Sequence, residues 1–140
     1  MIRTLAVAAA LALAAGAALA IGGDRRMTAD EAEAFIAGRT LVFAQELDGE
    51  PVAPVYGAEQ YLPGREAVWQ YPDGGCTRGA WRVNGDALCF AYADDPNLVL
   101  CWGFWEDDRG VFARLVNSPQ DDRLRVVRQL DGPLQCDPTS

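Results

Sequence analysis

The chain has 140 residues, 20 of them acidic and 12 basic, which gives a formal net charge of −8 at pH 7. An acidic chain with scattered arginines repels phosphate backbones and anionic lipids, which excludes nucleic-acid binding and disfavours membrane surfaces. The chain contains no histidine and no lysine. Ser-His-Asp and Cys-His catalysis, histidine-ligated metals and Schiff-base chemistry are therefore excluded.

The first 20 residues have the pattern of an export signal. Arg3 is followed by an unbroken run of small and apolar residues from 5 to 20, and charge returns at 24–26. The run ends in the small-x-small pattern that signal peptidase accepts. A retained membrane anchor is the alternative, but a spanning helix needs about 20 well-hydrophobic residues and this stretch is mostly alanine. We predict a cleaved signal peptide over residues 1–20 and a periplasmic or secreted protein that has no membrane contact after cleavage.

The rest of the chain is predicted to form a linker at 21–27, a single disulfide-stapled domain at 28–136 and a tail at 137–140. About 120 residues suit one domain and are too few for two. An even number of cysteines in an exported chain indicates disulfides, and the lack of histidine and of any C-x-x-C pair disfavours zinc. The cysteines are Cys76, Cys89, Cys101 and Cys136.

A short helix is predicted over residues 29–37. Thr28 and Glu31 have the spacing of a capping box, in which each side chain accepts from the backbone amide of the other residue. Apolar residues then share one helical face, and Gly38 stands where a helix ends.

The sequence from residue 40 onward predicts a mainly β fold. Short apolar runs alternate with turn sequences at regular spacing, which is typical of an antiparallel up-and-down meander forming a small barrel or a strongly curved sheet. Pro51, Pro54 and Pro63 interrupt the second run, which indicates an edge or irregular strand. The predicted strands span residues 40–45, 52–62, 67–71, 78–83, 87–92, 98–105, 111–116 and 124–130.

Turn lengths predict the register of the central strands. A two-residue Asn-Gly turn places Trp81 opposite Leu88, and a five-residue loop then places Leu88 opposite Trp102 and Tyr92 opposite Leu98. Because side chains alternate across a strand, these pairings collect the large apolar residues on one face. That face comprises Trp81, Leu88, Phe90, Tyr92, Leu98, Leu100, Trp102, Phe104, Val111 and Leu115.

The same register bears on the disulfides. It places Cys89 and Cys101 directly opposite each other on neighbouring strands, on the face away from the core. Opposed β-carbons lie about 4.5–5.5 Å apart, and the closer kind of opposed pair can be bridged. Cys76 and Cys136 are then left for each other. Four cysteines permit three connectivities, and we expect this one.

Residues 79–89 read G-x-W-x-x-x-G-D-x-L-C. With Cys101 and Trp102 following, this segment resembles uncharacterised small exported bacterial proteins in which a helix precedes a lipocalin-like β meander. The resemblance covers residues 28–116. It implies that Trp81 belongs to the core, that Gly85-Asp86 forms the turn and that Cys89 is a disulfide partner. No catalytic role is attached to the pattern.

Acidic clusters at 94–95, 106–108 and 121–122 raise two further possibilities. Glycosidases need two carboxyl groups at a fixed separation, but aspartates at turns are ordinarily solvated turn formers. Calcium takes six to eight oxygen ligands, and two loops at the same end of the meander could supply them. Without an EF-hand pattern we predict no metal and no cofactor. The calcium candidates are Asp94, Asp95, Asn97, Asp121 and Asp122.

The surplus of aromatic residues gives the leading functional hypothesis. An open barrel would hold an apolar ligand pocket, whereas a filled core is the alternative. Trp105 and Phe112 should pair on the opposite face as an exposed patch for a partner, unless the helix or a partner covers them. The predicted ligand-binding residues are Trp69, Tyr71, Trp81, Phe90, Trp102 and Phe104.

The sequence therefore favours an exported, non-enzymatic binding module for a small apolar ligand or for another envelope protein. It contains no residue that we predict to be catalytic. A carboxylate-based hydrolase is the enzymatic alternative, and a structural envelope protein without a ligand is the third.

Expression with a working secretion machinery should give a mature protein that begins at Ile21 or within a few residues of it, because the cleavage pattern ends at residue 20. N-terminal sequencing of the purified protein measures this directly. A membrane-embedded product that still begins at Met1 would instead make residues 4–22 an anchor.

Overall fold

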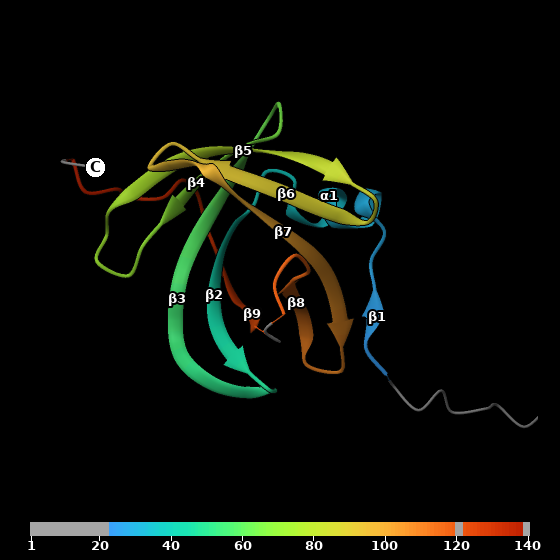
Figure 1. Ribbon diagram of the computed structural model, residues 1–140. Coiled ribbons are helices and arrows are strands. Elements are labelled where there is room, and N and C mark those ends of the chain that lie inside the picture. Colours follow the sequence, from blue (N-terminus) through green and yellow to red (C-terminus); the bar gives the residue numbers. More distant parts are fainter. Residues whose placement is uncertain (1–22, 120–121, 139–140) are drawn as a thin grey trace, which may run out of the picture.

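A computed structural model describes residues 23–119 and 122–138, in which eight antiparallel strands close into a barrel (Figure 1). From β2 to β9 each strand pairs with the next along the chain, and β9 pairs back with β2. The predicted mainly β meander is confirmed. The barrel strands are β2 (Thr40–Leu47), β3 (Glu50–Leu62), β4 (Glu66–Gln70), β5 (Cys76–Asn84), β6 (Ala87–Tyr92), β7 (Asp95–Asp107), β8 (Gly110–Leu115) and β9 (Asp122–Leu130).

Two elements precede the barrel. The short strand β1 (Arg25–Arg26) pairs with the far part of β7 and was not predicted. The helix α1 (Ala29–Ile36) begins with the predicted capping box. Thr28 Oγ1 accepts from the amide of Glu31 at 3.2 Å, and the Glu31 carboxylate accepts from the amide of Thr28 at 2.8 Å. This cap satisfies two backbone donors that the first helical turn leaves without partners.

The side chain of Glu33 attaches α1 to the barrel. Its carboxylate accepts from Trp81 Nε1 at 3.0 Å and forms an ion pair with Arg65 at 2.7 Å. Burial acts to raise the pKa of Glu33, but the hydrogen bonds from Arg65 and Trp81 outweigh it and hold that pKa below its ordinary value. The helix is therefore tied both to β5 and to the turn between β3 and β4.

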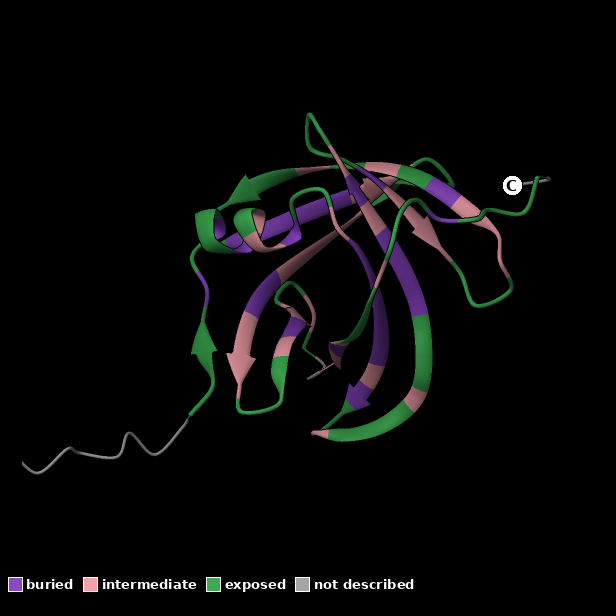
Figure 2. Ribbon diagram, turned by 180° about the vertical axis from the view of Figure 1, so that it is seen from behind, coloured by how far each residue is buried: buried purple, intermediate pink, exposed green. Residues whose placement is uncertain are grey.

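The main core lies inside the barrel and includes the buried face of α1 (Figure 2). Ile36 on the helix and Leu41 on β2 are almost fully buried, as are Leu88, Phe90 and Phe104 on the strands. Helix and strand side chains thus share one apolar cluster. The helix consequently fills part of the barrel interior with its own side chains.

The predicted register is confirmed between β6 and β7, where Leu88 lies opposite Trp102 and Cys89 opposite Cys101. The pairing of β7 with β8 is also as predicted, with Trp102 opposite Leu115.

Two predicted pairings are wrong. Trp81 lies opposite Phe90 and not Leu88, because the two-residue turn is Gly85–Asp86 and not the Asn84-Gly85 turn from which the register was predicted. A shift by one turn position moves the pairing by two residues and leaves every side chain on its predicted face. Tyr92 lies opposite Asp95 and not Leu98, because an irregularity follows Ala91.

The strand β3 is irregular in the half that carries prolines, as predicted. Its first part, including Pro51 and Pro54, pairs only with β2, and the register shifts there. Only Ala58–Leu62 also pairs with β4. Since proline has no amide to donate, it is tolerated where one side of the strand lacks a partner.

Both disulfides form as expected, Cys89 with Cys101 and Cys76 with Cys136. Together they suit an oxidising environment of the extracellular type. Across residues 23–119 and 122–138, no helix is long and apolar enough to cross a membrane.

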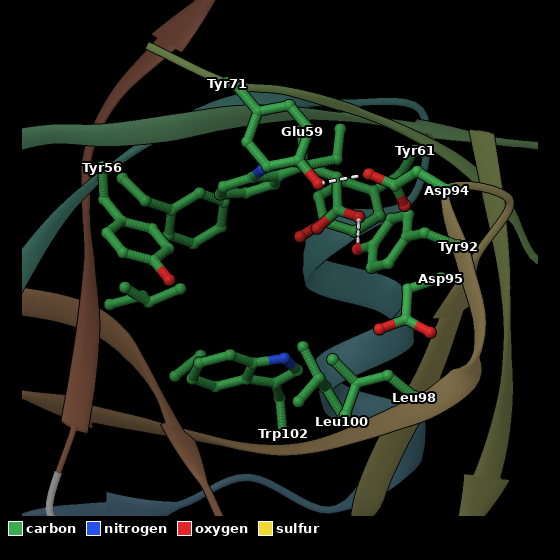
Figure 3. Close-up of a pocket in the computed structure, with 14 residues that line it drawn as sticks. Tyr56, Glu59, Tyr61, Tyr71, Tyr92, Asp94, Asp95, Leu98, Leu100 and Trp102 are labelled. Carbon is green, nitrogen blue, oxygen red and sulfur yellow. Dashed lines mark hydrogen bonds between the residues drawn. The ribbon is translucent and has the colours of Figure 1, made fainter. Parts of the chain in front are cut away.

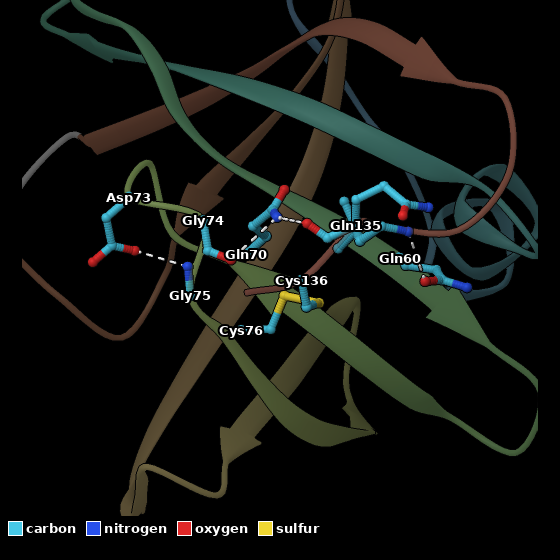
Figure 4. Close-up of a disulfide and its surroundings, with 9 residues drawn as sticks. Gln60, Gln70, Asp73, Gly74, Gly75, Cys76, Gln135 and Cys136 are labelled. Atoms are coloured by element: carbon cyan, nitrogen blue, oxygen red, sulfur yellow. Dashed lines mark hydrogen bonds between the residues drawn. A yellow bond between two sulfur atoms is a disulfide. The ribbon is translucent and has the colours of Figure 1, made fainter. Parts of the chain in front are cut away.

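The Cys76–Cys136 bond holds the C-terminal segment against the barrel (Figure 4). The Leu134 amide donates to Gln60 Oε1 at 3.1 Å, and the Asp137 amide donates to the carbonyl of Gly74 at 2.9 Å. The Leu134 side chain is buried against Val42 and Ala58 in a second, smaller apolar cluster.

Replacing Cys76 and Cys136 together by alanine should loosen the tail while the β6–β7 hairpin stays intact. The bond closes a sequence separation of 60 residues, and loop entropy assigns such a closure about 4 kcal/mol. Hydrogen exchange should accelerate at the amides of Leu134 and Asp137, and the denaturant midpoint should fall. The double variant of Cys89 and Cys101, which opens a separation of only 12 residues, is the control and should leave the tail protected. Unchanged tail exchange in the first variant would contradict this account.

Candidate functional site

A cavity of about 320 Å³ lies inside the barrel (Figure 3). In Figure 3 the helix α1 lies behind the residues that line the cavity. The barrel is therefore filled beside α1 and hollow beyond it, and the space is of the size that takes one small ligand. The lining residues are Phe43, Tyr56, Glu59, Tyr61, Trp69, Tyr71, Tyr92, Asp94, Asp95, Leu98, Leu100, Trp102, Ala113 and Leu124.

Three of the six predicted ligand-binding residues, Trp69, Tyr71 and Trp102, line this cavity. The other three lie elsewhere. Phe90 and Phe104 are buried in the packed core, and Trp81 packs on that core with its indole nitrogen bound to Glu33. Alternation along the strands placed Phe90, Trp102 and Phe104 on the same inner face but did not specify their depth in the barrel.

Trp69 is the centre of the aromatic wall. Its ring centroid lies 5.9 Å from that of Tyr56 and 6.4 Å from that of Tyr71, and the Tyr71 ring stands at 85° to it. Gly57 makes this placement possible, because a β-carbon there would lie 2.1 Å from the Trp69 ring. Gly79 makes room for Tyr92 in the same way, at 2.5 Å. Two rings of the site thus lie against glycine backbone on a neighbouring strand.

Glu59 is a buried acid on the cavity wall, and sequence reasoning did not identify it. Its side chain is almost inaccessible to solvent, and the Tyr92 hydroxyl donates to Oε1. The Tyr61 hydroxyl also hydrogen-bonds this carboxyl group. Burial raises the pKa of Glu59 to about 7, although both tyrosines act to lower it. The spacing to Tyr61 could have indicated this placement, because side chains two residues apart on a strand point to the same face of the sheet.

The rim of the cavity is held by a second tyrosine–carboxylate pair. The Tyr71 hydroxyl donates to Asp94 Oδ2 at 2.6 Å, and the Asp94 amide donates to Thr77 Oγ1 at 3.3 Å. The first bond raises the pKa of Tyr71 to about 12 and lowers the pKa of Asp94. Asp94 therefore stays ionised, and Asp95 follows it along the same rim (Figure 3).

The other acidic clusters do not form a site within residues 23–119 and 122–138. No group of three or more acidic or cysteine side chains there could hold a metal ion, and the calcium candidate Asp121 lies outside the described residues. Asp107 is not the solvated turn residue that the sequence indicates. It accepts from Arg125 Nη1 at 2.8 Å, and Arg125 also pairs with the buried Glu46 at 2.9 Å.

The predicted exposed patch at Trp105 and Phe112 is wrong, although the two residues do pair. Their rings stack at 6.2 Å with an interplanar angle of 12°, but Phe112 is fully buried. Arg26 of β1 lies 4.9 Å from the Trp105 ring centroid, and Arg125 lies 4.9 Å from that of Phe112. Arginine side chains from β1 and β9 therefore cover these rings by cation–π contact.

Comparisons of the chain with protein families, with curated proteins and with solved structures find no match. The resemblance of residues 79–89 to small exported bacterial proteins therefore stays a prediction. The function is inferred from the geometry of the cavity.

Replacing Glu59 by glutamine should remove a pH dependence of stability. Between its unfolded pKa of 4.5 and its folded pKa of about 7, the unfolded chain releases a proton that the folded chain keeps. The contribution of Glu59 to the free energy of unfolding is therefore fully present below pH 4.5. It falls by about 3 kcal/mol as the pH rises to 7.

The measurement is urea unfolding of the wild type and of Glu59→Gln at pH 4.5 and pH 8. The difference between their free energies of unfolding should change between the two pH values. Glu66→Gln at an exposed position of β4 is the control and should follow wild type. A difference between wild type and Glu59→Gln that does not change with pH would show that Glu59 ionises normally.

Proposed function

We propose that this protein is an exported, non-enzymatic binding module that takes a small, largely apolar ligand into the barrel cavity. The observation that carries the proposal is the aromatic-walled cavity of about 320 Å³ inside a closed barrel. Several lining residues, among them Tyr56, Tyr71 and Leu98, are also exposed to solvent. The cavity is therefore reachable from the surface.

The character of the walls supports ligand uptake over a purely structural role. A core that only stabilises a fold is close-packed, with few voids larger than a water molecule. Here Trp69, Tyr71 and Trp102 surround open space. The ring placement depends on glycines that forgo side chains of their own.

A protein partner on the outer face has less support than an internal ligand. That hypothesis depended on an exposed pair at Trp105 and Phe112, and arginine side chains cover these rings. Periplasmic or secreted localisation is supported by the two disulfides and by the predicted signal peptide over residues 1–20.

A carboxylate-based hydrolase is the second candidate, and one observation favours it. The cavity holds Glu59, whose pKa is raised to about 7, and Asp94, whose pKa is lowered. Environments that separate two carboxyl groups in this way are typical of acid–base pairs. Turnover of chromogenic glycosides or esters that is lost in Glu59→Gln would support this function. If none of these glycosides or esters is turned over, the hydrolase function is contradicted and the binding function is favoured.

The neutral dye N-phenyl-1-naphthylamine should bind the wild-type protein saturably, with a rise in its fluorescence. Trp102→Ala should weaken that binding roughly tenfold, because it removes a large apolar wall. Trp105→Ala is the matched control, since this tryptophan lies on the same strand but outside the cavity. The control should bind the dye as wild type does. Failure of the wild type to bind, or equal losses in both variants, would contradict uptake into the cavity.

A further inference from the structure

We propose that the ligand of this cavity is a small organic cation, an amine or quaternary ammonium group on an apolar body. The inference rests on the proposed binding function and specifies its ligand class. Among the cavity-lining residues that the structure describes, Glu59, Asp94 and Asp95 are acidic and none is basic. Charge complementarity therefore disfavours fatty acids and other anions, which need a cationic partner inside a cavity.

None of the arginines that the structure describes lines this cavity, and several are paired elsewhere. Arg65 pairs with Glu33, Arg125 pairs with Glu46 and Asp107, and Arg25 pairs with Glu31 and Glu106. Since the sequence contains no lysine or histidine, arginine is its only cationic side chain, and no described arginine lines the cavity. An anionic ligand would face carboxylates and aromatic rings without compensation.

The aromatic residues add an independent preference for a cation. The rings of Tyr56 and Tyr71 both neighbour that of Trp69, at interplanar angles of 56° and 85° to it. Rings inclined in this way present π-faces from different directions, which is the arrangement that binds ammonium groups. Trp102 lies on the wall facing Tyr71 and Glu59 (Figure 3). An apolar body can pack on these rings while the charge stays near them.

The acidic residues of the cavity lie at two different depths in it. Asp94 and Asp95 lie at the rim, where an approaching cation meets them first and is attracted by their field. Glu59 lies on the inner wall, where the Tyr92 and Tyr61 hydroxyls fix its carboxyl group. A cation close to Glu59 favours the ionised form of that acid. The rim thus attracts the ligand and the inner acid holds it.

The experiment compares three ligands with one apolar body: 4-phenylbutylamine, 4-phenylbutanol and 4-phenylbutyrate. Each is titrated at pH 8 into the mature, disulfide-bonded protein in competition with N-phenyl-1-naphthylamine. The amine should bind at least tenfold more tightly than the alcohol, and the carboxylate most weakly. A cation–π contact combined with a partly buried charge pair is of about this strength.

Asp95→Asn and Glu59→Gln should each lower the ratio of amine affinity to alcohol affinity several-fold. Asp86→Asn is the matched control, because it removes the same charge from an exposed turn outside the cavity. That control should keep the wild-type ratio. Asp95 is exposed, so its variant should fold and give a result even if Glu59→Gln does not.

The possible failures are distinguishable. If the alcohol or the carboxylate binds as tightly as the amine, or if only the dye binds, the cation proposal is overturned and the binding function stands. If neither the dye nor any of the three ligands binds, the proposed function fails and the cation proposal fails with it. An equal loss of selectivity in Asp86→Asn would assign the preference to overall charge and would also overturn the proposal.

Discussion

The pairing of β2 with β9 joins the first barrel strand to the last, and the interior of the molecule exists only because of that closure. Closure gives both strands the backbone partners that they would lack as edge strands of an open sheet. An eight-stranded barrel has an interior wide enough for its own side chains or for one small ligand. Because α1 contributes Ile36 to the core at one end, the strands do not have to fill the whole interior. The remaining space is the cavity.

Much of the fold could be predicted because its determinants are local. The capping box at Thr28 and the turn sequences lie within a few residues of the structure they specify. The predicted five-residue loop at 93–97 gave the Cys89–Cys101 pairing correctly, although β7 already begins at Asp95. The turn after β5 was misplaced because Asn84-Gly85 and Gly85-Asp86 are both acceptable turn dipeptides. A shift of two residues leaves the apolar face unchanged, so hydrophobic patterning cannot detect it.

The site was harder to predict because it depends on contacts between distant segments. Periodicity indicates that a side chain points inward, yet Phe90 and Phe104 became core while Trp102 came to line the cavity. Glu59 was missed because a carboxylate ordinarily faces solvent, and its burial here depends on a hydroxyl from Tyr92, which lies on a distant strand. The covering of Trp105 by Arg26 depends on β1, a strand of two residues with no sequence signal of its own.

The glycines under Trp69 and Tyr92 have a consequence for how this cavity can change over evolution. Gly57 and Gly79 do not line the cavity, yet the missing side chain at each one sets how far the opposing ring withdraws from the centre. A methyl group added at Gly57 or Gly79 would meet the ring and also a backbone carbonyl of the neighbouring strand, at 2.8 and 2.7 Å, so it would displace both the ring and the local strand pairing and change the space. The accepted ligand size can therefore be altered by substitutions on the backbone side of the rings, while every group that touches the ligand keeps its identity.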